Sequence, residues 1–128
     1  MKEGKRSDRV GEQLRMEIAD LLIRGKLRDP DAKDVIVSGV KVTDDLSIAR
    51  VYVRVLGEAD EARRGRVVRA LQRAAGFLRR ELGPKLRLRR TPELDFHWDE
   101  LIDRVEGIER ALHEIDAERR ESSQEDES

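Results

Sequence analysis

The residues of this chain best suited to binding a ligand are arginines, and they gather in one stretch. Between residues 63 and 90, eleven basic residues stand against a single acid, Glu81, which gives this stretch a net charge of +10. The whole chain of 128 residues carries a formal net charge of −1. A guanidinium is planar, permanently charged and able to bind two phosphate oxygens at once. The separation of charge therefore predicts a polyanionic partner on one face of the molecule.

Four of these arginines share one side of a helix predicted from about Asp60 to Leu82. This set, the basic ridge, consists of Arg66, Arg69, Arg73 and Arg80. At 3.6 residues per turn it lies nearly opposite an apolar face. That apolar face consists of Val67, Val68, Leu71, Ala74, Ala75, Leu78 and Leu82. Gly76 falls within the ridge, where we expect it to kink the helix or to let a backbone approach closely.

A solvated face that is merely rich in arginine is the alternative to a phosphate-binding ridge. In that case Gly76 is only tolerated, at a cost of about 1 kcal/mol relative to alanine. Solvated helices usually interleave both signs of charge, because pairs four residues apart stabilise them. Acids are scarce here, which favours phosphate binding. Phe77 lies on the basic side and could stack on a base, but we expect it to turn into the core.

Basic residues after the helix extend the positive surface into a third strand. They are Lys85, Arg87, Arg89 and Arg90. Arg6 and Arg9, before and within the first helix, are further candidates. We predict that these six residues and the basic ridge bind RNA, with affinity that falls as salt rises.

Catalysis has little support in the residue types present. The chain has no cysteine and only two histidines, His97 and His113. His97 alternates with Phe96 and Trp98 on a predicted strand, so it should face outward, and with Asp99 it supplies too few ligands to hold a metal. No phosphate-binding loop or zinc-protease motif occurs. We therefore predict a protein that is not an enzyme, without cofactor, metal site or small-molecule substrate.

Apolar periodicity predicts the order α-β-β-α-β-α. The first helix covers about Asp8 to Arg24, with Ser7 as its N-cap and Gly25 just past its end. Residues 35–42 and 47–55 read as a hairpin around a turn at 43–46. The third strand region spans 85–98 with a bend at Thr91-Pro92, and the last helix spans about 100–118. This pattern fits an α+β fold, a three-stranded sheet covered by helices on one face.

We predict one domain over residues 1–116 and a disordered acidic tail over 117–128. No apolar stretch follows the basic N-terminus as in a signal peptide, and no run long enough to cross a membrane exists. The expected location is the cytoplasm, with no membrane partner.

The last helix raises a rival hypothesis. Its apolar residues follow heptad-like spacing: Leu101, Val105, Ile108, Leu112 and Ile115. They could form a dimer seam, which would make the chain a protein-interaction module with no RNA role. About two heptads are short for a stable coiled coil, so we expect packing across the sheet and a monomer.

Four stretches in order resemble the ribosome-binding factor A family of bacterial small-subunit maturation factors. They are RVGEQLRMEIADLL, VTDDLSIARVYVRV, LQRAAGFLRREL and LRLRRTPELDFHWDE, within about 110 residues from Arg6 to Ile115. The resemblance implies a KH-like domain of the type II arrangement. In this family an Ala-x-Gly step between two helices replaces the usual GXXG loop. Ala74 and Gly76 match that step and would form the kink.

The family likeness also implies a role. It implies binding to the free small (30S) ribosomal subunit and its 16S rRNA, and promotion of late maturation, including processing of the 16S rRNA 5′ end. It further implies a link to growth in the cold. The acidic end, ESSQEDES, matches nothing in the family pattern, so its role stays open.

Overall fold

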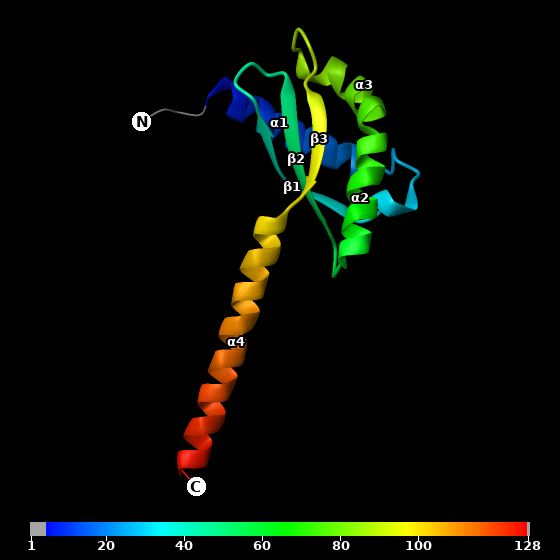
Figure 1. Ribbon diagram of the computed structural model, residues 1–128. Coiled ribbons are helices and arrows are strands. Elements are labelled where there is room, and N and C mark those ends of the chain that lie inside the picture. Colours follow the sequence, from blue (N-terminus) through cyan, green and yellow to red (C-terminus); the bar gives the residue numbers. More distant parts are fainter. Residues whose placement is uncertain (1–4, 128) are drawn as a thin grey trace. The chain divides into compact units, whose positions relative to one another are not determined.

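The computed structural model describes the backbone of residues 5–127 and the side chains of residues 5–101 and 108–121. The chain divides at Trp98 into two compact units. The first contains, in order, α1 (Arg6–Ile23), the 3-10 turn η1 (Pro30–Ala32), β1 (Val35–Val42), β2 (Ile48–Val55), α2 (Glu61–Arg73), α3 (Ala75–Leu86) and β3 (Glu93–Trp98) (Figure 1). The second is α4 (Glu100–Glu127). The predicted α+β order, with a broken long helix, is confirmed.

The three strands form one mixed sheet in the order β1-β2-β3. β1 pairs with β2 antiparallel, and β3 joins β2 in parallel after the α2–α3 crossover. Strict alternation directs Ala49, Val51, Val53 and Val55 of β2 to one face, where all four are buried. That face meets α1, α2 and α3, so the aliphatic core lies between the sheet and these helices.

α1 approaches the sheet closely because of one glycine. A stripe of Val10, Leu14, Ile18 and Leu21 is buried against the sheet. A Cβ at Gly11 would lie 2.9 Å from the carbonyl oxygen of Val40 on β1, inside normal van der Waals contact. Gly11 is therefore required by the packing of the helix on the strand.

Backbone groups on the outer edge of β3 form hydrogen bonds with a side chain from α2. The Gln72 side chain donates from Nε2 to the Leu94 carbonyl oxygen (3.0 Å) and accepts at Oε1 from the Phe96 N–H (3.0 Å). These two bonds replace those that another strand would make. They also fix α2 against the sheet.

The third strand is shorter than predicted. Leu86 and Leu88 suggested a strand from residue 85, but α3 continues to Leu86 and β3 begins only at Glu93. Leu78, Leu82 and Leu86 are four residues apart and all buried, so Leu86 continues the helical stripe. The helix passes through Pro84 and ends at Leu86, and the next residue, Arg87, caps it with a left-handed φ of 51°.

The predicted N-cap of α1 is wrong, whereas the glycine predicted just past its C-terminal end is confirmed. α1 begins at Arg6, and its N-cap is Lys5, whose backbone N–H donates to the Asp8 carboxylate (3.3 Å). Ser7, the predicted N-cap, lies inside the first turn and is buried. Gly25 follows the C-cap with φ +68°, as predicted for the residue that ends this helix.

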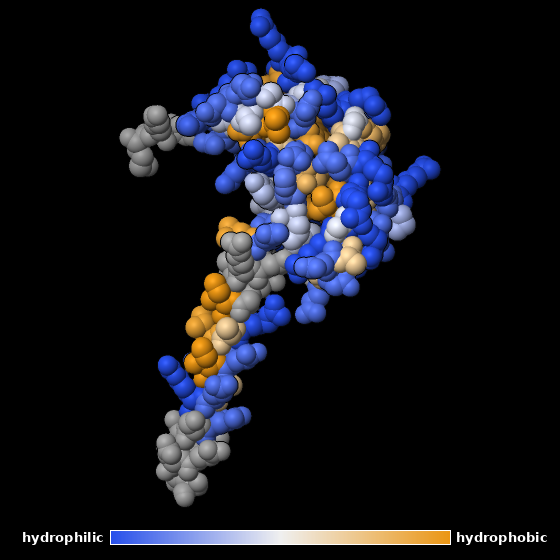
Figure 2. Space-filling model, viewed as in Figure 1, coloured by the Kyte–Doolittle hydropathy of each residue, from blue (hydrophilic) through white to orange (hydrophobic). Residues whose placement is uncertain are grey.

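α4 runs from Glu100 to Glu127, beyond the predicted end near Glu118 and through the predicted tail. The division of the chain at residue 116 stays a prediction. Leu101, Ile108, Leu112 and Ile115 are exposed, and Figure 2 shows apolar side chains gathered along one side of α4. Val105 and the tail residues after Glu121 lie outside the described side chains.

The two units carry opposite charge. Residues 1–98 contain 23 basic and 16 acidic residues, which gives +7, whereas residues 99–128 contain 4 and 12, which gives −8. The near-neutral total of −1 is thus the sum of a basic unit and an acidic helix.

Candidate nucleic-acid interface

The basic ridge lies on the outward side of α2 and α3. Arg66, Arg69, Arg73 and Arg80 are all exposed. The opposite side of the helices buries Val67, Leu71, Leu78 and Leu82 completely. Figure 2 shows hydrophilic side chains over the outer surface of these two helices. Burial of the apolar stripe therefore fixes the arginines toward solvent.

Two ridge arginines have partners from the protein itself. Arg73 Nη2 lies 3.1 Å from Asp29 Oδ2, and Arg66 Nε lies 3.6 Å from Asp31 Oδ1. Both acids belong to the segment around η1, so the two pairs connect that segment to α2. The backbone N–H of Asp31 and then the Arg73 guanidinium lower the pKa of Asp29 below its ordinary value.

These pairs reduce the charge that the ridge offers without removing it. The side chains of Arg66 and Arg73 remain 49% and 64% exposed. A guanidinium has five N–H donors, so each keeps donors that face solvent. Such exposed pairs typically contribute about 0–1 kcal/mol to stability. A phosphate could therefore compete for either arginine.

Arg69 and Arg80 have no ion-pair partner in the described part of the chain. Each lies four residues after a glycine. A Cβ at Gly65 would lie 3.0 Å from Arg69 Nη1, and one at Gly76 would lie 3.9 Å from Arg80 Nη1. Both glycines thus leave room for a guanidinium along the helix surface.

The break between α2 and α3 is centred on Ala74, with φ −85° and ψ −2°. The backbone bonds at this point run from Ala74 N to Ala70 O (3.2 Å) and from Leu78 N to Ala74 O (3.0 Å). Within the described backbone, no bond across the break begins at the amides of residues 75–77. Gly76 lies in the first turn of α3 and is exposed. Exposed amides at a helix N-terminus can bind anions.

A second group of arginines lines a cleft of about 470 Å³, here called the arginine cleft. It combines Arg6 at the start of α1 with Arg87, Arg89 and Arg90 from the loop between α3 and β3. Leu88 from the same loop, and Asp45 and Leu46 from the β1–β2 turn, complete the lining. All four arginines are exposed, and no described carboxylate pairs with them. Arg6 joins the later arginines through tertiary structure, which periodicity could not reveal.

Asp45 is the one acid among the residues lining this cleft, and its own turn satisfies it. The Thr43 and Ser47 hydroxyls each donate to Asp45 Oδ1 at 2.7 Å, and the Ser47 N–H donates at 3.1 Å. These bonds, the Thr43 hydroxyl first, lower the pKa of Asp45 from 3.8 to about 2. The carboxylate therefore remains charged at neutral pH and serves the turn.

The remaining candidates are placed differently. Lys85 Nζ lies 3.6 Å from Glu17 Oε2, so it joins α3 to α1. Arg9 is exposed on α1 but does not line the arginine cleft. Phe77 is half-buried and packs against the core, as expected. Arg79, which the site prediction omits, binds the Thr91 carbonyl oxygen through Nε (3.0 Å) and Nη2 (2.7 Å).

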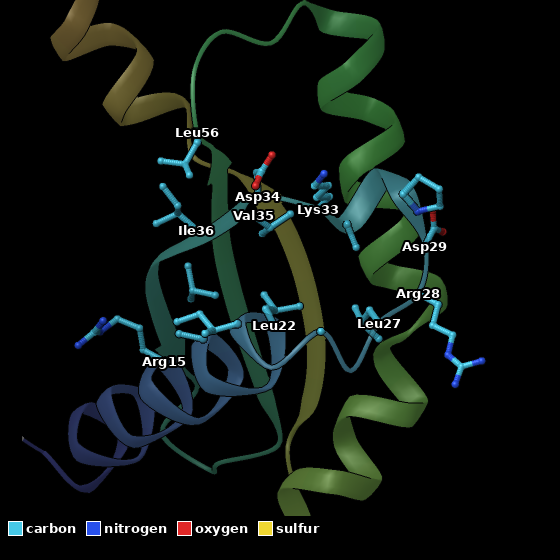
Figure 3. A pocket seen from close by; sticks show the side chains of 16 residues that line it. Arg15, Leu22, Leu27, Arg28, Asp29, Lys33, Asp34, Val35, Ile36 and Leu56 are labelled. Carbon is cyan, nitrogen blue, oxygen red and sulfur yellow. The ribbon is translucent and has the colours of Figure 1, made fainter.

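A larger cavity of about 710 Å³ lies between the end of α1, the segment before β1, and β1 itself (Figure 3). Leu22, Leu27, Val35, Ile36 and Leu56 give it a mainly aliphatic lining. Such a lining suits contact with an apolar side chain better than acid–base chemistry.

The two histidines belong to different units of the chain. His97 is exposed, as predicted, and its Nε2 lies 2.8 Å from Asp95 Oδ2. His113 is exposed on α4. Among the described residues, no three histidine or acidic side chains are close enough to hold a metal ion. None of the helices described is both long and apolar enough to span a bilayer.

Comparison with known proteins places these features in one family. The family model for ribosome-binding factor A matches residues 6–112. A crystal structure of ribosome-binding factor A from Thermus thermophilus superposes with a TM-score of 0.62 at 29% identity, covering 72% of this chain and 93% of that one. The solution structure of a putative ribosome-binding factor A from Thermotoga maritima has a TM-score of 0.56 at 35% identity, covering 73% and 91%.

A third structure concerns a complex. It is a homology model of the Thermus thermophilus factor, fitted into a cryo-electron microscopy map of a 30S complex with that factor. Its TM-score is 0.56 at 31% identity, covering 70% of this chain and 91% of that one. The α+β arrangement matches these structures and agrees with the KH-like fold. With the family model covering more than half of its residues, the chain belongs to the ribosome-binding factor A family.

Proposed function

We propose that this protein binds the free 30S ribosomal subunit through 16S rRNA. The fitted complex of the Thermus thermophilus factor with 30S supports this partner. The observation that carries the proposal is the set of exposed arginines on the basic ridge and in the arginine cleft, most of them without a carboxylate partner in the described part of the chain. Unneutralised guanidinium groups that lie close together repel one another, and phosphates relieve that repulsion.

The ten predicted RNA-binding residues have unequal roles in this proposal. Arg69, Arg80 and the four arginines of the arginine cleft bind phosphates directly. Arg66 and Arg73 hold the η1 segment and bind phosphate with their remaining donors, while Lys85 and Arg9 add charge at the margin. The break centred on Ala74 bends the ridge and presents the first amides of α3, and Gly76 leaves room for the Arg80 guanidinium beside them.

In the cell, the protein acts as a non-enzymatic assembly factor in the cytoplasm. It promotes late maturation of the small subunit and processing of the 16S rRNA 5′ end, and it supports growth in the cold. Cells that lack the gene should accumulate precursor 16S rRNA. A plasmid copy should restore processing, and a copy carrying Arg69→Glu and Arg80→Glu should not.

Binding to purified 30S subunits over a range of salt concentrations tests the proposal most directly. Arg69→Glu with Arg80→Glu should weaken binding and lower the slope of log affinity against log salt by roughly 0.7–0.9 for each phosphate that is no longer bound. Arg73 is a poorer choice, because a glutamate there would repel Asp29. The matched control is Arg119→Glu with Arg120→Glu, which changes the charge equally on α4 and should weaken binding less, because it acts only through long-range repulsion. Equal 30S affinity and equal salt dependence in the two double variants would refute phosphate binding by the ridge.

The rival function is self-association through α4. The exposed Leu101, Ile108, Leu112 and Ile115 favour it. The heptad continues to positions 119 and 122, which are Arg and Ser, so the apolar seam ends after about two heptads. We propose a monomer off the ribosome. Sedimentation equilibrium distinguishes the two, since a concentration-dependent mass would favour the rival.

A further inference from the structure

The sheet has a second face, which α1, α2 and α3 do not cover. Side chains that alternate with the buried ones lie on it, and cross-strand register places them in rows. One row joins Gly39, Tyr52 and His97, and the next joins Lys41, Arg50 and Asp95. None of these residues belongs to the basic ridge or the arginine cleft.

Two rings lie side by side in the first row. The centroids of Tyr52 and His97 are 5.8 Å apart, and their planes are tilted by 32°. Asp95 Oδ2 lies 2.8 Å from His97 Nε2 and so holds the imidazole in place. Gly39 is paired with Tyr52 on its other side, and nothing lies within 4 Å of where its Cβ would be. The missing side chain leaves open space beside Gly39, next to the half-buried Tyr52.

The neighbouring row adds positive charge. Lys41 and Arg50 are directly paired across β1 and β2 and are both exposed. Like charges directly opposite each other on a sheet destabilise it. Asp95 is paired with Arg50 on the β3 side and offsets part of this repulsion, while it also lies 2.8 Å from His97 Nε2. Glu93 lies at the start of β3, opposite Ile48.

We propose that this face binds single-stranded RNA, with two consecutive unpaired bases stacked on Tyr52 and His97 and the connecting phosphates bound by Lys41 and Arg50. Aromatic rings on an open sheet, flanked by cations, recognise bases that are splayed out of a helix. Base-paired RNA has its bases stacked inside the duplex and cannot use this surface. The proposal shares its partner class with the proposed function but depends on a separate set of residues.

Fluorescence anisotropy with a labelled uridine hexamer tests this surface in the full-length protein. Tyr52→Val and His97→Val remove the rings and introduce a β-branched residue, which suits a strand. Each should weaken hexamer binding by about five- to a hundred-fold. Tyr52→Phe keeps the ring and should bind within about twofold of the wild type. A short RNA duplex, in which every base is paired, should bind all four proteins equally.

Photocrosslinking gives an independent readout, because it maps contact directly. Ultraviolet irradiation of the hexamer complex, followed by mass spectrometry, should attach uridine to the peptide that contains Tyr52. Attachment only to peptides from α2, α3 or residues 87–90 would overturn the proposal. The proposal would also be overturned if both valine variants, with circular dichroism like that of the wild type, bound the hexamer with unchanged affinity.

The outcomes also separate this proposal from the proposed function. If Arg69→Glu with Arg80→Glu abolishes 30S binding while Tyr52→Val binds the hexamer normally, the function stands and the sheet surface is refuted. If Arg69→Glu with Arg80→Glu leaves 30S binding unchanged while Tyr52→Val loses affinity for the hexamer, the sheet surface is supported and phosphate binding by the ridge is refuted.

Discussion

Gly65 and Gly76 each lie one helical turn before an arginine of the basic ridge. Neither has the left-handed φ that only glycine adopts readily, since Gly25 and Gly57 are the two glycines with positive φ in the described backbone. Their common property is the space that Arg69 and Arg80 occupy. Gly76 therefore affects the surface of α3 more than its backbone, and the break itself is centred on Ala74.

Substitutions at Gly76 test this distinction. Gly76→Ala should fold normally and bind 30S within about twofold of the wild type, because its Cβ would meet only Arg80 Nη1 at 3.9 Å. Gly76→Leu should also fold, since the position is exposed, but should bind at least several-fold more weakly because the side chain obstructs the ridge. Thermal unfolding provides the folding control. Weak binding by the alanine variant would show instead that the helix break itself requires glycine.

Asp45 gives a prediction at low pH. Its pKa in the folded protein, about 2, is below the ordinary value of 3.8, so the carboxylate stabilises the β1–β2 turn when charged. The contribution is present above pH 3.8 and is lost as the pH falls through about 2. Asp45→Asn should remove this part of the pH dependence, measured by urea unfolding between about pH 2 and 5. Parallel pH profiles for the two proteins would contradict the assignment.

Among the secondary-structure elements, the attachment of α2 to β3 depends on one amide side chain. Gln72 both donates to and accepts from the backbone of β3. Gln72→Leu should lower the free energy of unfolding by about 1–2 kcal/mol, because a strand N–H and a carbonyl lose their partners. The free energy of unfolding of Gln72→Glu should lie between those of the wild type and Gln72→Leu, since the carboxylate still accepts from Phe96 but cannot donate to Leu94. Urea unfolding would measure both variants. A larger loss of stability in Gln72→Glu than in Gln72→Leu would contradict this role.

At this scale the sequence predicts elements better than it predicts their ends. The alternation of Val51, Val53 and Val55 with Arg50, Tyr52 and Arg54 determines strand β2 and its buried face unambiguously. Leu86 and Leu88 fit period two, but Leu86 equally fits the four-residue spacing of α3, and burial decided between them. The predicted arginines are exposed because burial of the opposite face requires it.

Tertiary contacts explain what the sequence could not predict about the site. Asp29 and Asp31 pair with Arg73 and Arg66 only because η1 packs beside α2. Likewise, Arg6 meets Arg87, Arg89 and Arg90 across about 80 residues of chain. Such meetings leave no periodic signal in the sequence.

For the whole molecule, the main electrostatic feature is the separation of +7 on residues 1–98 from −8 on residues 99–128. The side chains of the core cluster all lie within residues 10–98, so a chain that ends at Trp98 should fold. It should bind RNA faster and more tightly than the full chain at low salt, because an acidic tether no longer opposes approach. Stopped-flow binding at several salt concentrations checks this, with the difference vanishing at high salt. No difference at low salt would mean that α4 has no electrostatic influence on binding.

The parallel pairing of β3 with β2 has a consequence for how the chain acquires its structure. β1 and β2 are joined by a short turn and can pair early, but Ile48 meets Glu93 only after the whole crossover is complete. Contacts so distant in sequence form slowly because closure of a long loop precedes them. During synthesis, the β1–β2 hairpin therefore exposes one edge of β2 to solvent. That edge stays unpaired until the ribosome has released the chain as far as Trp98, the last residue of β3.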